Sequence, residues 1–185
     1  MFKKIFYFLL FSFVFIQCSN KSIEYEIQYE LQMIDTLQHR LGEVKSWLDK
    51  IDIEDYAERA DIIENNYYYC DSYFRTHKIE VTKDISTMMD EYKGLMNIYK
   101  IVLNNHKNIV METEELYIQL KTLKNSTKSK DYKKETFKQY FQKEKEDILK
   151  LHDMAKYVLT PAIVTENNFQ RRQTEVEDLM GSFKK

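Results

Sequence analysis

Hydrophobic residues recur along most of the chain at steps of three and four, the spacing that places side chains on one face of an α-helix. Between residues 22 and 50 this stripe advances by about 3.5 residues per step, as in a coiled-coil seam. The pattern therefore predicts an amphipathic helix over this tract. Its apolar positions are Ile23, Ile27, Leu31, Ile34, Leu37, Leu41, Val44, Leu48 and Ile51.

Further helical tracts are predicted after it, at about 52–76, 82–124 and 131–159. Asp52 is of a residue type that caps helix N-termini, and the third tract is expected to open at Thr82 or Asp84. The polar residues 104–108 interrupt the third stripe, and the pattern leaves open whether they form a kink or a turn. A polar loop is expected at 125–130, and Thr160-Pro161 predicts a new helix or a bend.

The predicted fold is all-α, an elongated antiparallel bundle of four or five helices with coiled-coil-like seams over residues 23–185. The chain contains only 3 glycines and 1 proline, which leaves few of the residues that form the tight turns of a sheet. Glu144 occupies a polar position in the fourth seam, where a carboxylate either extends to water or sets the register.

The N-terminus follows a different pattern. Lys3 and Lys4 precede an apolar run over residues 5–16, and the chain becomes polar from Gln17. A basic start, a short apolar run and a polar boundary are typical of a secretory signal peptide. The run is too short to span a bilayer as a stable helix.

The segment Phe15-Ile16-Gln17-Cys18 directly follows this run and resembles the lipobox of bacterial lipoproteins. In that family the cysteine becomes the first mature residue and carries acyl chains. The resemblance implies a signal peptide at 1–17, lipidation of Cys18, a short tether at 18–22 and attachment to a membrane of the bacterial cell envelope, facing the periplasm or the exterior. The alternative is an ordinary signal peptide, or an uncleaved anchor, with an incidental cysteine.

The second helical tract carries an unusual aromatic cluster. Because consecutive helical residues point in different directions, one face cannot bury all of them. In one interpretation Tyr67, Cys70 and Phe74 are core and the other hydroxyls lie at the water boundary. In the other the cluster is a partner-contact patch, since tyrosine is enriched at protein interfaces. The predicted contact residues are Tyr67, Tyr68, Tyr69, Tyr73 and Phe74.

Candidate chemistry is sparse. The four histidines, at 39, 77, 106 and 152, lack the glutamate three residues earlier that di-metal bundles use. No catalytic residue, metal site or cofactor is therefore predicted. The net charge of −2 argues against a nucleic-acid partner, which normally requires a strongly basic face.

These patterns favour a membrane-anchored protein–protein interaction or scaffold module over an enzyme. The alternative is a small-ligand binder or enzyme with a site inside the bundle, near Cys70 and the aromatic residues. A pocket lined by converging polar groups would favour the alternative.

Overall fold

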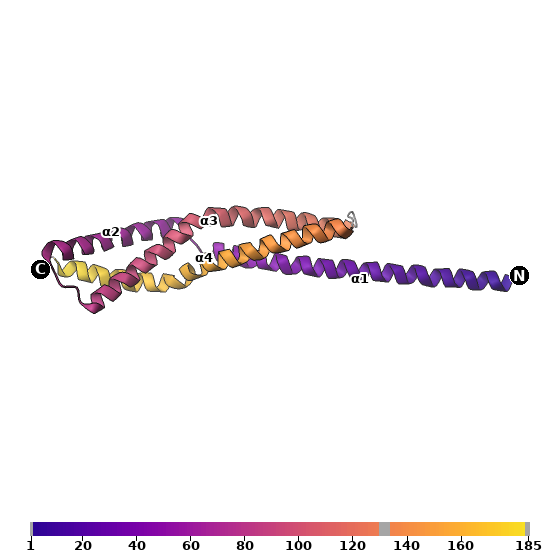
Figure 1. Ribbon diagram of the computed structural model, residues 1–185, viewed down its shortest axis with the longest axis horizontal. Coiled ribbons are helices and arrows are strands. Elements are labelled where there is room, and N and C mark those ends of the chain that lie inside the picture. The colour runs from indigo at the N-terminus through magenta and orange to yellow at the C-terminus, as the bar shows by residue number, and fades with distance from the viewer. Residues whose placement is uncertain (1, 130–133, 184–185) are drawn as a thin grey trace. The chain divides into compact units, whose positions relative to one another are not determined.

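The computed structural model describes the backbone of residues 2–129 and 134–183, and the side chains of residues 25–129 and 136–183. Over these residues the secondary structure is helical, without a strand. The helices are α1 (Phe2–Leu48), α2 (Ile53–His77), α3 (Lys83–Ser129) and α4 (Lys134–Ser182), shown in Figure 1. The predicted all-α bundle is confirmed, with four helices over the described backbone.

Two helix starts lie where the sequence placed them. The Asp52 carboxylate caps α2 and accepts hydrogen bonds from the backbone N–H groups of Glu54 and Asp55, at 3.0 and 3.2 Å. The Thr82 hydroxyl accepts from the N–H of Ile85 at the start of α3. In both cases a short polar side chain satisfies a donor that the first helical turn leaves unpaired.

The predicted loop at 125–130 is wrong for its described residues, because α3 continues to Ser129. Hydroxyl groups of this stretch donate to backbone carbonyls of α3, and the helix continues through them. Thr127 Oγ1 donates to the Leu123 carbonyl at 2.9 Å, and Thr127 is fully buried. Residues 104–108, for which the sequence left open a kink or a turn, do not form a turn: they lie within the continuous helix α3.

The sequence predicted that a new helix or a bend begins at Thr160-Pro161, but α4 runs through Pro161 without a break. Proline lacks the N–H that would bond to the carbonyl four residues earlier, that of Tyr157. Both Pro161 and Tyr157 are exposed, so water can solvate the carbonyl. The proline thus lies on the solvent-exposed face of α4, where the missing hydrogen bond can be replaced by water.

The helices form two compact units. The first unit contains residues 1–41 and 115–148, and the second contains 42–114 and 149–185. In the first unit the C-terminal part of α3 runs opposite to α1 and to the N-terminal part of α4 (Figure 1). Its apolar core comes from all three segments: Ile34, Leu37, Leu41, Leu116, Leu120, Phe137 and Ile148.

The second unit packs α2 against the N-terminal part of α3 and the C-terminal part of α4. Two tyrosines of α3, Tyr92 and Tyr99, are fully buried at its centre. The apolar stripes predicted from helical spacing supply most of the remaining core, which confirms them. Among the buried residues are Val44, Tyr56, Ala60, Ile63, Cys70, Leu95, Val102, Leu151, Ala155, Val158, Phe169 and Val176.

Candidate functional site

The predicted aromatic cluster lies on α2, and its members have different surroundings. The Tyr68 and Tyr69 side chains are exposed, at 59% and 44% of their full accessible area. Tyr67 is half-buried, and the ammonium of Lys93 lies 4.9 Å from the centre of its ring. Tyr67 is therefore engaged in a cation–π contact within the second unit.

Tyr73 and Phe74 face the C-terminal end of the chain. The Tyr73 ring stacks on that of Phe183, with centroids 3.9 Å apart and planes 8° apart. Its hydroxyl donates to the backbone carbonyl of Phe183 at 3.2 Å. Phe74 meets the same ring edge-on at 5.4 Å. Both residues are half-buried in an intramolecular contact, which leaves Tyr68 and Tyr69 as the outward-facing pair.

Cys70 is fully buried beneath this cluster. Burial raises the pKa of its thiol to about 11. A thiol with this pKa is protonated at neutral pH, whereas nucleophilic attack and metal binding require the thiolate. Cys70 acts as a small apolar core residue.

A charged cluster lies inside the second unit. Arg59 forms an ion pair with Glu166, a second one with Asp55 at 3.2 Å, and lies 5.2 Å from the centre of the Phe169 ring. Burial, followed by the charge of Glu166, raises the pKa of the neighbouring Tyr99 to about 12. The tyrosine thus remains a neutral hydroxyl, and the guanidinium is compensated by carboxylates. This arrangement joins α2 to α4.

A second polar contact joins three helices. The Tyr92 hydroxyl accepts a hydrogen bond from Asn66 Nδ2 at 3.3 Å and donates one to Gln173 Oε1. Burial raises the pKa of Tyr92 to about 12. A buried phenol needs such partners because an unpaired hydroxyl is costly away from water.

One histidine is buried in a polar contact. His152 Nε2 lies 3.0 Å from a carboxylate oxygen of Glu43, and its ring packs 5.1 Å from Trp47. Glu43 is 109 positions away in sequence, so local spacing could not reveal the pair. Across the side chains that the structure describes, no three histidine, cysteine or acidic residues gather closely enough to hold a metal ion.

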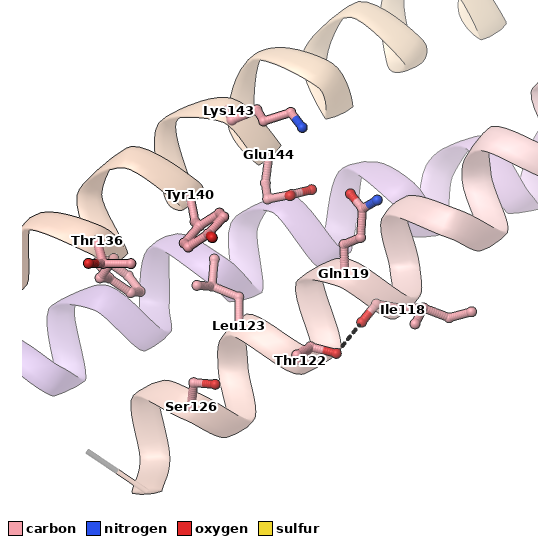
Figure 2. A pocket seen from close by; sticks show the side chains of 10 residues that line it. Ile118, Gln119, Thr122, Leu123, Ser126, Thr136, Tyr140, Lys143 and Glu144 are labelled. Carbon is pink, nitrogen blue, oxygen red and sulfur yellow. Dashed lines mark hydrogen bonds between the residues drawn. The ribbon is translucent and has the colours of Figure 1, made fainter. Parts of the chain in front are cut away.

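The first unit contains a pocket of about 520 Å³ between α3 and α4 (Figure 2). This volume lies within the range of small-molecule sites. Its walls are largely apolar and include Ile118, Leu123, Phe137 and Tyr140. Hydroxyl and amide groups of Gln119, Thr122, Ser126 and Thr136 also line it.

Glu144 is the acidic residue of this pocket. Figure 2 shows its carboxyl group directed from α4 toward α3. The residue is only 7% exposed, and its Oε2 atom has no hydrogen-bond partner among the described side chains and backbone. Burial raises the pKa of this carboxyl, and the charges of Asp147 and Glu115 raise it further, while Lys143 opposes them.

The sequence indicated Glu144 as a polar residue in a seam but did not predict the pocket around it. The only available signal was its position among apolar residues at heptad spacing. Whether such a carboxylate reaches water or remains buried depends on side chains from another helix.

Cys18 lies outside the residues whose side chains are described, as do the predicted signal peptide and tether. These features remain predictions. Among the described side chains, no helix offers a stretch long and apolar enough to cross a membrane.

Comparison of the chain with protein-family models, with curated proteins and with solved structures found no match.

Proposed function

We propose that the protein is a bacterial lipoprotein, anchored in the cell envelope through acylated Cys18, that serves as a protein–protein interaction module facing the periplasm or the exterior. The observation that carries the interaction role is the exposure of Tyr68 and Tyr69 as neighbours on α2. Tyr67, Tyr73 and Phe74 are half-buried in contacts within the molecule. Tyr68 and Tyr69 also have ring neighbours, Tyr67 at 5.9 Å and Phe183 at 6.2 Å, but much of their surface stays exposed.

An exposed pair of tyrosines supports binding for a physical reason. Each ring offers a large apolar surface together with a hydroxyl that can donate or accept a hydrogen bond. Such residues often carry much of the binding energy at protein interfaces. The helix that presents them is capped by Asp52 and held to Phe183 by Tyr73, so the pair is displayed on an ordered element.

The proposed anchor rests on the lipobox-like segment. Each methylene of an acyl chain that enters the bilayer contributes roughly 0.8 kcal/mol, and a single chain alone holds only marginally. Several chains on one cysteine would attach the protein firmly. The anchor would then hold the protein at the membrane that its envelope partners share.

The test is quantitative capture of partners after cross-linking in native membranes. The double variant Tyr68→Ala/Tyr69→Ala should lose at least 80% of the specific partner signal. The matched control is Tyr157→Ala, which removes the most exposed tyrosine of α4, at 77%, and should leave capture unchanged. Tyr73 is kept in both variants because its loss would disturb the contact with Phe183.

Capture should also fall in Cys18→Ala, because that variant cannot be acylated. Equal capture by the wild type and the double tyrosine variant would reject the tyrosine pair as the contact surface. A protein that enriches no specific partner in any form would reject the interaction role.

A further inference from the structure

The Glu144 carboxyl group is a buried hydrogen-bond acceptor in a largely apolar pocket. Its Oε2 atom is buried, and none of the residues that the structure describes donates a hydrogen bond to it. Leaving such an acceptor unpaired is costly, and more so when it carries a charge. The side chain is directed into the space between α3 and α4 (Figure 2). A ligand that brings a donor or a positive charge would satisfy it.

The charges nearby favour a cation over an anion. Glu115 and Asp147 act on Glu144 as further negative charges, one from α3 and one from α4. Lys143 is the basic residue among those lining the pocket, but it is exposed to water, whereas Glu144 is buried. Water screens an exposed ammonium more strongly than a buried carboxylate.

The pocket walls favour an organic cation over a metal ion. Calcium requires six to eight oxygen ligands, and magnesium requires six in near-octahedral geometry. The described side chains provide no group of three acidic or metal-binding residues. Leu123, Phe137 and Tyr140 instead offer apolar surface, which binds hydrocarbon.

We propose that this pocket binds a small organic amine, with the ammonium group on Glu144 and an aromatic or branched apolar body against Leu123, Phe137 and Tyr140. The raised pKa of Glu144 is consistent with this assignment, because a bound cation would favour the charged carboxylate that burial disfavours. The site does not depend on the proposed partner surface, since Tyr68 and Tyr69 belong to the second unit.

The test compares three probes that share an indole body and differ in charge. Tryptamine is a cation at neutral pH, tryptophol is neutral and indole-3-propionate is an anion. Titration calorimetry on the purified full chain should give a dissociation constant for tryptamine at least tenfold lower than for tryptophol. Indole-3-propionate should bind most weakly.

Two variants separate charge from shape. Glu144→Gln should reduce the preference for tryptamine over tryptophol to twofold or less, while Glu146→Gln, an exposed carboxylate on the same helix, should retain it. Tyr140→Ala should weaken tryptamine and tryptophol about equally, because it removes apolar wall but no charge. Its side chain is 59% exposed, so the fold should persist.

Three results would overturn the proposal. One is the absence of tryptamine binding at millimolar concentration. Another is equal affinity of the wild type for the cation and its neutral analogue. The third is an equal loss of cation preference in Glu144→Gln and Glu146→Gln, which would indicate a general surface charge effect.

Discussion

A buried carboxyl group that lacks hydrogen-bond partners makes the stability of a protein depend on pH. Glu144 is buried, and its Oε2 atom has no partner in the part of the chain that the structure describes. Its pKa in the folded chain lies above the ordinary value, first because of burial and then because of Asp147 and Glu115. Below the ordinary pKa, the folded and unfolded states both hold the proton. As the pH rises through the raised pKa, the folded state must release it into a poor environment, and stability is lost.

The variant Glu144→Gln should remove this loss because its amide stays neutral. We expect the free energy of unfolding at pH 7 to be about 1 kcal/mol higher than in the wild type, with a smaller difference at pH 4. Urea unfolding between pH 4 and 8 measures it, and Glu146→Gln serves as the exposed control. A difference between Glu144→Gln and the wild type that does not vary with pH would contradict the prediction.

Arg59 allows a second prediction at the scale of one residue. Its side chain is only 18% exposed and pairs with Glu166 and Asp55. Arg59→Met keeps the aliphatic stem but leaves Glu166 without its cation. We expect a loss of about 1–2 kcal/mol in the free energy of unfolding, less than for a fully buried pair because Glu166 is partly exposed.

The matched control for Arg59 is Arg75→Met. Arg75 pairs with Asp71 at 2.9 Å, but its side chain is 79% exposed. An exposed pair contributes little, so the cost should stay below about 0.5 kcal/mol. Chemical denaturation of both variants distinguishes the two cases, and equal losses would show that burial of Arg59 adds nothing to its ion pairs.

At the scale of the helix, the spacing of apolar residues predicted core positions correctly, whereas polar residues and proline predicted helix ends that the structure does not have. Positions such as Leu41, Tyr99 and Leu151 could be predicted as core because a helix repeats its faces every three to four residues. The helix ends after residues 124 and 159 were predicted from polarity and from proline, and both are wrong because α3 and α4 continue past them. The hydroxyl groups of Thr127 and Thr160 there donate to carbonyls of their own helices, one turn earlier.

Contacts between distant parts of the chain could not be predicted from spacing at all. Tyr73 reaches Phe183 across 110 positions, and Arg59 reaches Glu166 across 107. A helical pattern shows which face of a residue's own helix is apolar, but not which partner covers it. For the same reason the pocket beside Glu144 could not be predicted, because its walls come from α3 as well as α4.

Pro161 provides a test at the scale of the helix. Pro161→Ala restores the backbone N–H and removes a ring that crowds the preceding turn. The alanine also makes the unfolded chain more flexible, which offsets part of the gain. We expect a net stabilisation of about 1–2 kcal/mol, seen as a higher midpoint in thermal unfolding.

Pro161→Gly is the control for this substitution. Glycine restores the same N–H group but has a helix propensity about 1 kcal/mol poorer than that of alanine. The glycine variant should therefore be less stable than the alanine variant by about that amount. If Pro161→Ala is instead destabilised, the proline is required for a local geometry of α4 that alanine does not support.

For the whole molecule, the membrane anchor can be tested through the two cysteines of the chain, Cys18 and Cys70. We expect only Cys18 to be available for acylation. Cys70 is fully buried, and burial raises the pKa of its thiol to about 11, so it presents no accessible thiolate while the protein is folded. Cys18 is the last residue of the lipobox-like segment, so any acyl chain on the protein is expected there.

Labelling cells with an alkyne-tagged palmitate separates these two positions. The wild type and Cys70→Ala should incorporate the label, and Cys18→Ala should lose it and leave the membrane fraction. Cys70→Ala is the control for Cys18→Ala, because each variant removes one thiol but only Cys18→Ala removes the proposed site of acylation. Label retained in Cys18→Ala would place the modification elsewhere, whereas an unlabelled wild type would mean that the N-terminal segment does not act as a lipoprotein signal.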